Sequence, residues 1–310
     1  MNEIKIILLC NNRIAIPAIR ELYFYGNLAA VLIPGNNKDV IADVQTILKD
    51  TGIPLLAVKK KTFVVQMQQV LDETKAEAGL IMTFPFKLEP LIYSAPSRGF
   101  FNFHYGILHQ YRGPEPIFAQ IKNSESLAGI TVHLINDTID AGPVVMEEKI
   151  RIEPDDTYGM LQSKLAYIGA GMAGNLVKTL HFSPAIPSKA QDESKAVYYQ
   201  RPGLNDVLIN WKEMDSSAIK ALVNACNPWN KGAGVRIRNY MIGLLEVEIT
   251  AEETAENIVP GTIVSLNSGG LYIATKDKRM LKVTAIYCPE GYISGHRLSA
   301  FGIKAGDRFE

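Results

Sequence analysis

The first half of the chain alternates short apolar stretches with segments of helical periodicity. Ile4–Cys10 is a continuous apolar run, as expected of a parallel strand that is buried on both faces. Ala15–Tyr25 follows with the spacing of an amphipathic helix, and Leu28–Ile33 is apolar again. The alternation continues through the predicted elements Val40–Lys49, Pro54–Val58, Phe63–Asp72, Gly79–Phe84, Leu88–Ser94 and Gly99–His104. Strands and helices that alternate in this way predict an α/β fold with a doubly wound, mostly parallel sheet.

The same kinds of element continue after residue 104. Pro114–Asn123 and Tyr158–His181 are predicted helices, and Gly129–Ile135 and Val144–Ile150 are predicted strands. Glycines within the second helix are expected to allow close packing rather than to bind phosphate.

The composition changes at residue 183. Residues 183–203 hold three prolines and many polar side chains, which predicts an extended linker. A helix is predicted over Ser216–Asn227. It is followed by short predicted strands at Gly234–Arg238, Met241–Thr250, Gly261–Leu266, Gly270–Ala274 and Met280–Tyr287. Short strands separated by turn residues predict a small, OB-like β-barrel. We therefore expect an α/β domain over residues 1–182 and a β-barrel domain over residues 204–310.

The composition favours a soluble protein of a reducing compartment. Hydrophobic residues make up 47% of the 310 residues, enough for real cores. Lys plus Arg and Asp plus Glu both number 32, so bulk charge does not indicate a nucleic-acid partner. The three cysteines, Cys10, Cys226 and Cys288, lie far apart without the spacing of a metal site. With no apolar run of ~20 residues and no signal peptide, we expect a cytoplasmic location and no membrane partner.

Three polar residues are candidates for a catalytic site. Asn102 and His104 are two positions apart on a predicted strand, so their side chains point to the same face. They lie where that strand ends, and ligands of doubly wound sheets collect at the carboxyl ends of strands. Asp140 lies in the polar stretch Asn136–Pro143 and offers a carboxylate. An amide, an imidazole and a carboxylate suit a reaction that passes through a charged tetrahedral intermediate.

The order of these residues resembles that of a known enzyme family. Asn102-Phe103-His104 is followed by Tyr111-Arg112-Gly113, then by the strand Gly129–Leu134 and by Asp140-Ala141-Gly142. This pattern is similar to that of the 10-formyltetrahydrofolate-dependent formyltransferases, whose catalytic domain is Rossmann-like. Similarity to the methionyl-tRNA formyltransferases extends into the C-terminal part at Val197–Tyr199, Ile209–Trp211, Asn227–Trp229, Gly295–Arg297 and Ala305–Phe309.

The resemblance implies a reaction, a cosubstrate and roles for the site residues. An amine would attack the formyl carbon of 10-formyltetrahydrofolate, with Asn102 donating to the oxyanion, His104 moving protons and Asp140 holding His104. No metal is implied. The folate would lie on two loops, with contacts from Met82, Thr83, Phe84, Pro85, Phe86, Leu88, Ile135, Asn136, Asp137, Thr138 and Ile139. The amine acceptor would meet His109, Tyr111, Arg112 and Gly113. Phe84 and Phe86 also suit ordinary core aromatics.

Two stretches depart from the family pattern and leave the acceptor open. Between His104 and Arg112 the family usually has Ser-Leu-Leu-Pro, where this chain has Gly106-Ile107-Leu108-His109. The tRNA-formylating enzymes carry a long basic insertion after the second strand, whereas Pro34–Asp39 is short and holds one lysine. His133 lies in the middle of a predicted strand, where a structural role is expected.

These departures keep several functions in view. Transfer to initiator methionyl-tRNA, as in translation initiation, is the leading interpretation. Transfer to a small amine, such as an amino-sugar nucleotide, is one alternative. Hydrolysis of formyltetrahydrofolate and a non-catalytic, folate-binding regulator are two others. The sequence leaves the oligomeric state and the pathway undefined.

Overall fold

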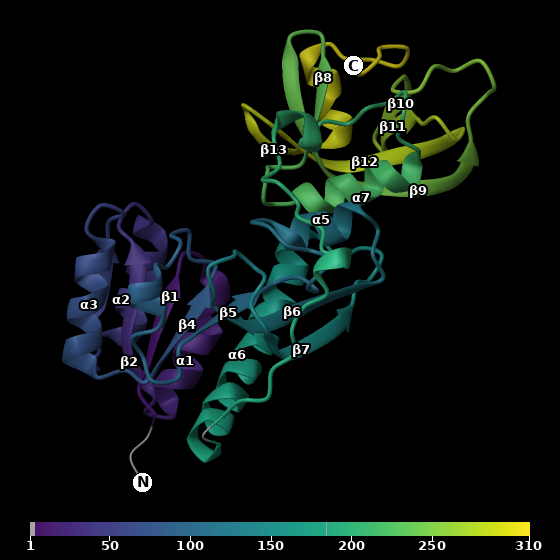
Figure 1. The fold of residues 1–310 in the computed structure, drawn as a ribbon. Helices are drawn as coiled ribbons and strands as arrows, with labels where there is room; N and C mark the ends of the chain where they lie inside the picture. Colours follow the sequence, from purple (N-terminus) through teal and green to yellow (C-terminus); the bar gives the residue numbers. More distant parts are fainter. Residues whose placement is uncertain (1–3, 184) are drawn as a thin grey trace. The chain divides into compact units, whose positions relative to one another are not determined.

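A computed structural model describes residues 4–183 and 185–310, which form two compact units (Figure 1). The first unit comprises the described residues of three segments, which are Met1–Pro116, Ala128–Ile150 and Gln162–Tyr199. The second comprises Ile117–Leu127, Arg151–Leu161 and Gln200–Glu310. The division of the chain into residues 1–182, a linker over 183–203 and residues 204–310 stays a prediction, and Pro184 of that linker lies outside the described residues.

The first unit is built on a seven-stranded sheet with the order β3-β2-β1-β4-β5-β6-β7. The strands are β1 (Ile6–Cys10), β2 (Leu28–Pro34), β3 (Leu55–Val58), β4 (Ala78–Met82), β5 (Phe100–His104), β6 (Leu127–Leu134) and β7 (Val144–Arg151). The pairs among β1 to β5 are parallel, and β5 pairs with β6 in the antiparallel direction. The chain steps outward from β1 to β3 and then returns to β4, which is the reversal typical of a doubly wound sheet. The predicted α/β fold is confirmed.

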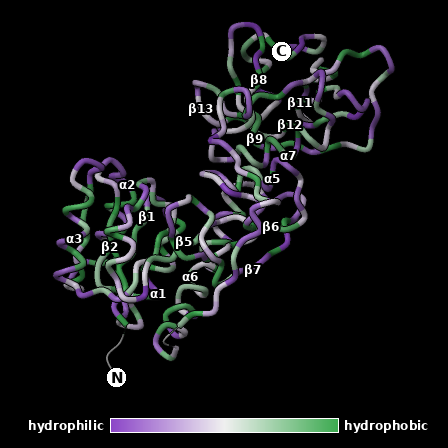
Figure 2. Tube along the Cα trace, in the orientation of Figure 1, coloured by the Kyte–Doolittle hydropathy of each residue, from purple (hydrophilic) through white to green (hydrophobic). Residues whose placement is uncertain are grey.

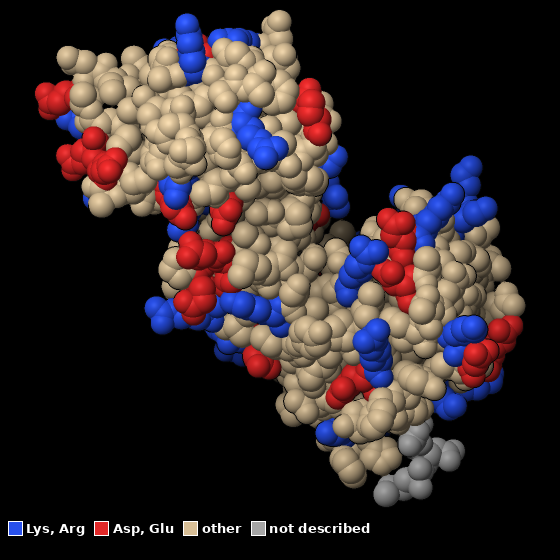
Figure 3. All heavy atoms as spheres, turned by 180° about the vertical axis from the view of Figure 1, so that it is seen from behind, with Lys and Arg blue, Asp and Glu red and all other residues tan. Residues whose placement is uncertain are grey.

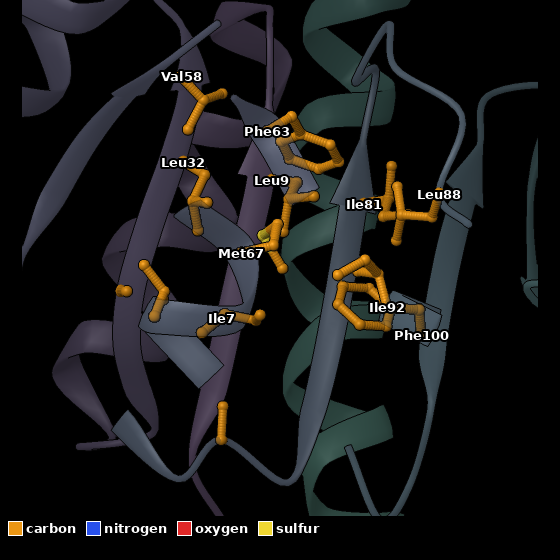
Figure 4. Close-up of a cluster of buried hydrophobic side chains, with 13 residues drawn as sticks. Ile7, Leu9, Leu32, Val58, Phe63, Met67, Ile81, Leu88, Ile92 and Phe100 are labelled. Carbon is orange, nitrogen blue, oxygen red and sulfur yellow. The ribbon is translucent and has the colours of Figure 1, made fainter. Parts of the chain in front are cut away.

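Helices cover both faces of this sheet. On one face, α3 (Phe63–Thr74) and α4 (Pro90–Tyr93) contribute to a buried cluster with β1, β2, β4 and β5 (Figure 4). Its labelled members include Leu9, Met67 and Phe100. On the other face, α1 (Ile16–Phe24) and α6 (Tyr158–Phe182) lie side by side. The amino group of Lys178 in α6 lies over the ring of Tyr25, which caps the end of α1. The remaining helix, α2 (Lys38–Leu48), connects β2 to β3 and is capped by the side chain of Asn37.

Side-chain alternation along β5 decides where the candidate site lies. Phe100 belongs to the buried cluster on the α3 and α4 face, so Asn102 and His104 point to that same face. Tyr105 is buried on the α6 side, where its ring lies beside Gly169. The hydropathy of the trace follows this layout, with β1 and β2 largely hydrophobic (Figure 2).

The second unit is an antiparallel sheet that closes on itself. Its strands run in the order β10-β11-β12-β9-β8, with β13 paired to β12. They are β8 (Ala233–Ile237), β9 (Tyr240–Glu253), β10 (Ile263–Asn267), β11 (Gly270–Ala274), β12 (Arg279–Cys288) and β13 (Gly291–Ser294). The last residues bridge the two edges, since Glu310 exchanges backbone hydrogen bonds with Arg236 of β8, while Phe309 donates to Gly261 and Asp307 accepts from Ile263. This tail gives the domain the predicted barrel-like form.

Two helices complete the second unit. They are α5 (Pro116–Lys122) and α7 (Ser216–Cys226). Phe118 of α5 packs against Trp229, which follows α7, with ring centroids 5.2 Å apart. The short 3-10 helices of the chain are η1 (Arg13–Ala15), η2 (Glu193–Lys195), η3 (Leu204–Val207) and η4 (Gly295–Phe301).

Among the described residues no helix is long and apolar enough to cross a membrane. The three cysteines are buried free thiols. Burial raises the pKa of Cys10 and of Cys226 to about 12 each, so both remain protonated at neutral pH.

Candidate active site

Asn102 and His133 face each other across β5 and β6. The antiparallel register pairs the two residues directly, and Asn102 Nδ2 lies 3.1 Å from His133 Nε2. His133 Nδ1 donates to the backbone carbonyl of Leu134 at 2.9 Å, which leaves Nε2 as the acceptor for the Asn102 amide. Burial is the largest influence on this imidazole and lowers the pKa of His133 to about 4. His133 is therefore neutral at pH 7 and fixes the orientation of the Asn102 amide.

His104 is buried at the end of β5, with 5% of its surface exposed. Its Nε2 donates to the backbone carbonyl of Tyr111 at 2.5 Å. Its Nδ1 lies 3.6 Å from Asp140 Oδ1, which is within range of an ion pair but beyond a hydrogen bond. Since Nε2 is anchored, Nδ1 is the nitrogen left to gain or lose a proton.

Glycine at position 106 allows this arrangement of His104. A Cβ on Gly106 would lie 3.0 Å from His104 Nε2, 3.1 Å from the Tyr111 carbonyl oxygen and 2.7 Å from Pro116 Cβ. The Gly106 carbonyl also accepts from the Thr131 hydroxyl at 2.8 Å. The departure from the family's serine thus gives the His104 ring room to reach Tyr111.

Asp140 reaches the site from the loop between β6 and β7. It has a left-handed backbone, with φ of 57°. Its Oδ2 accepts a hydrogen bond from the backbone N–H of Gly113 at 3.0 Å, while Oδ1 faces His104 and lies 3.9 Å from His133 Nε2. The carboxylate is 10% exposed, so its interactions with both imidazoles are only weakly screened by water. The structure therefore brings together Asn102, His104 and Asp140, which the sequence singled out.

An extended segment, residues 189–199, packs along the loop that follows His104. Lys189 exchanges backbone hydrogen bonds with Val144 of β7, and Tyr199 donates to the Arg112 carbonyl at 2.9 Å. The rings of Tyr111 and Tyr199 stack with centroids 5.1 Å apart. Gly113 has no room for a side chain, because a Cβ there would lie 2.0 Å from the Tyr199 carbonyl oxygen. We call residues 189–199 the strap.

Arg112 is engaged by the strap. Its guanidinium donates to both carboxylate oxygens of Glu193 and to Gln191 Oε1, and its side chain is 7% exposed. The hydrogen bond to Glu193 raises the pKa of Arg112 and lowers that of Glu193. Tyr111 and Gly113 flank it and serve the site through their backbone groups. His109, the fourth predicted acceptor residue, accepts from the Val197 N–H through its own carbonyl and is half-buried.

The two predicted folate loops share an apolar base. Phe84, Phe86 and Ile135 pack against the buried cluster of the α3 and α4 face, as does Tyr93. The Tyr93 hydroxyl donates to Asp137 at 2.8 Å and ties α4 to the second loop. Phe84 and Phe86 also contact each other and Phe63, with centroids 5.0 to 5.4 Å apart, so both are core aromatics in this structure.

The other residues of these loops divide between core and surface. Met82 and Leu88 are buried, whereas Thr83, Pro85, Asn136, Asp137, Thr138 and Ile139 are exposed. Partly buried aromatics with exposed loop residues beside them in the sequence suit a flat heteroaromatic ring with polar edges.

Two residues of the site lay outside the sequence-based prediction. The position of His133 in the middle of a strand predicts a structural role, and its antiparallel pairing with Asn102 brings it to the site. Gln191 lies in the predicted linker, and no local pattern distinguishes it. Over residues 4–183 and 185–310, no group of three or more His, Cys, Asp or Glu could hold a metal ion.

Comparison with known proteins supports both units. Residues 29–172 match the formyl transferase family, and residues 204–293 match the C-terminal domain of formyl transferases. The methionyl-tRNA formyltransferase of Kosmotoga olearia is 26% identical over 88% of both chains. That of Clostridium tetani is 26% identical over 95% of this chain and 97% of its own.

A solved structure shares the fold. The N-formyltransferase of Helicobacter canadensis, described in complex with folinic acid and dTDP-3-aminofucose, superposes with a TM-score of 0.70. It covers 90% of this chain and 98% of its own at 16% identity.

Proposed function

This chain belongs to the formyl transferase family, and we propose that it transfers the formyl group of 10-formyltetrahydrofolate to the amino group of initiator methionyl-tRNA. The observation that carries the proposal is the convergence of Asn102, His104 and Asp140 at the end of β5. The two relatives are named methionyl-tRNA formyltransferases, and the chain aligns with most of their length. This similarity favours that acceptor. We place the reaction in the cytoplasm, in keeping with the buried free thiols.

The proposal gives each of the three side chains a task. When the amine attacks the formyl carbon, negative charge develops on the formyl oxygen. One N–H of Asn102 Nδ2 points to His133, and the other would donate to that oxygen. His104 Nδ1 takes the proton that the amine loses and passes it to the folate nitrogen as the bond between that nitrogen and the formyl carbon breaks. The nearby carboxylate of Asp140 stabilises the imidazolium formed in between.

The folate is expected to lie on the two loops above Phe84, Phe86 and Ile135. Exposed residues at Thr83, Pro85 and 136–139 would present backbone groups to the edges of the pterin. The folate then supplies the formyl group next to Asn102 and His104.

One observation favours a second acceptor, a small amine such as an amino-sugar nucleotide. Only residues 35–37 connect β2 to α2, so no basic insertion is present there. On the face drawn in Figure 3, lysines and arginines are interspersed with acidic side chains. A surface of mixed charge lacks the excess of cations that phosphate binding uses.

A panel of acceptors tests the proposal. The purified protein is incubated with 10-formyltetrahydrofolate and charged initiator methionyl-tRNA, amino-sugar nucleotides, or water alone, and formylated product and released folate are measured. We expect transfer to methionyl-tRNA that falls steeply with added salt. Transfer to the sugar nucleotide alone would establish the second acceptor, and folate release in water alone would identify a hydrolase. Folate binding without turnover for any acceptor would refute the transferase.

A further inference from the structure

We propose that Gln191 of the strap is a positioning residue for Asp140, an inference that rests on the proposed formyl transfer. The side-chain amide of Gln191 joins the Arg112 guanidinium to the backbone carbonyls of Asp140 and Gly142, in the loop that carries the Asp140 carboxylate. Residues of the strap thereby set the distance between that carboxylate and His104.

The hydrogen bonds of Gln191 define its orientation. Its Nε2 donates to the Asp140 carbonyl at 2.8 Å and to the Gly142 carbonyl at 2.8 Å. Its Oε1 accepts from Arg112 Nη2 at 2.8 Å and from Arg112 Nε at 3.3 Å. Exchanging oxygen and nitrogen would place an oxygen against two carbonyls and an NH₂ against a guanidinium. Both donors and both lone pairs of the amide are therefore used in the one orientation that the surroundings allow.

The loop that Gln191 holds needs support. Asp140 is a non-glycine residue with a left-handed backbone, a strained conformation that persists where neighbouring groups enforce it. The Asp140 carboxylate accepts a hydrogen bond from the Gly113 N–H at 3.0 Å. Gln191 adds one bond to the Asp140 carbonyl and one to the Gly142 carbonyl, and so holds the backbone at both positions. A shift of this backbone would change the 3.6 Å separation between Asp140 Oδ1 and His104 Nδ1.

Arg112 and Glu193 anchor Gln191 in turn. Glu193 forms an ion pair with Arg112 at 2.6 Å, but its own carboxylate is 63% exposed. Water screens the exposed carboxylate, so the main effect of the pair is to orient the buried guanidinium from which Gln191 accepts. Glu193 thus orients Arg112, Arg112 orients Gln191, and Gln191 holds the backbone of Asp140.

Gln191→Glu is the central test, because it keeps the length and the acceptor facing Arg112 but replaces both donors. A carboxylate oxygen would then face the carbonyls of Asp140 and Gly142. We expect kcat for formyl transfer to fall by about 10- to 100-fold, as for a catalytic group displaced by ~1 Å. KM for the folate should stay within about twofold, because the variant leaves the apolar base of the folate loops intact. Gln45→Glu, the same substitution at an exposed position of α2, is the matched control and should leave kcat unchanged.

A double-mutant cycle distinguishes positioning from a general structural effect. If Gln191 acts through Asp140, Gln191→Glu should cause no further loss of kcat in an Asp140→Asn background. If Gln191→Glu fails to fold, Gln191→Met takes its place in the cycle, because methionine lacks both donors and adds no charge. Independent losses in the double mutant, an unchanged kcat, or a raised KM with normal kcat would each overturn the proposal.

A readout without turnover separates this inference from the proposed function. The imidazole ¹⁵N resonances of His104, assigned with a His104→Asn variant, should move in Gln191→Glu and stay in place in Gln45→Glu. If the wild-type protein formylates no amine, the proposed function fails while these resonances still report on Asp140. Unmoved His104 resonances in Gln191→Glu would refute the positioning role.

Discussion

The amide nitrogen of Asn102 lies 3.1 Å from Nε2 of His133 on the neighbouring antiparallel strand. Because His133 Nδ1 donates to the Leu134 carbonyl, the imidazole can only accept from Asn102 while it is neutral. The orientation of the proposed oxyanion donor therefore depends on a buried histidine that holds no proton on Nε2.

Removal of the Asn102 amide should slow formyl transfer without unfolding the protein. We expect Asn102→Ala to lower kcat by roughly 10²- to 10³-fold, the range for loss of one oxyanion donor. Steady-state kinetics of transfer provide the measurement. Asn175→Ala, at an exposed position of α6, serves as the control and should keep full activity. Activity of the Asn102 variant within twofold of wild type would exclude the amide from the reaction.

His104 should be required for turnover but not for folate binding. His104→Asn removes the proposed proton carrier, so we expect kcat to fall by roughly 10²- to 10⁴-fold. The dissociation constant for a folate analogue, measured by calorimetry, should change little because the folate loops do not depend on this ring. His181→Asn in the last turn of α6 is the control. A fully active His104 variant would refute the mechanism.

His133 should make the stability of the protein depend on pH. Its pKa is about 4 in the folded state, against 6.5 for an ordinary histidine. Since the unfolded chain binds the proton more readily, this contribution is complete above pH 6.5 and is lost as the pH falls towards 4. At ~1.4 kcal/mol per pKa unit, the full loss is about 3 kcal/mol.

Urea denaturation of wild type and of His133→Gln at several pH values measures this contribution. The free energy of unfolding should fall more steeply with acid in the wild type than in the variant. Parallel curves over this range would show that His133 is not held neutral by burial.

Gly142 should tolerate no side chain. A Cβ there would lie 1.7 Å from the Leu134 carbonyl oxygen, so alanine must push the loop of Asp140 away from β6. We expect Gly142→Ala to lower the free energy of unfolding by about 2 kcal/mol or more, as strained substitutions do. Gly171→Ala, on an exposed turn of α6 with no atom within 4 Å, is the matched control and should stabilise by about 0.5–1 kcal/mol. Equal stabilities for the two variants in thermal denaturation would contradict the contact geometry.

Local patterns were sufficient for most of the fold. The apolar run at β1 and the helical spacing of α1 and α3 each depend on a few neighbouring residues, so the order of elements followed from the sequence. The strand β13 was not predicted, because four residues beside a turn carry too weak a pattern. The closure of the second sheet by residues 307–310 also lay beyond prediction, since it depends on contacts with β8 and β10.

For the candidate site, the sequence by itself determined that Asn102 and His104 share one face at the end of a strand, because side chains alternate along extended backbone. The tertiary structure alone decided which groups surround them. The register of two antiparallel strands places His133 beside Asn102. A loop with a left-handed residue carries Asp140, and a segment after the last helix of the first unit carries Gln191. Such meetings depend on strand register and on the paths of distant loops, which the pattern of neighbouring residues does not encode.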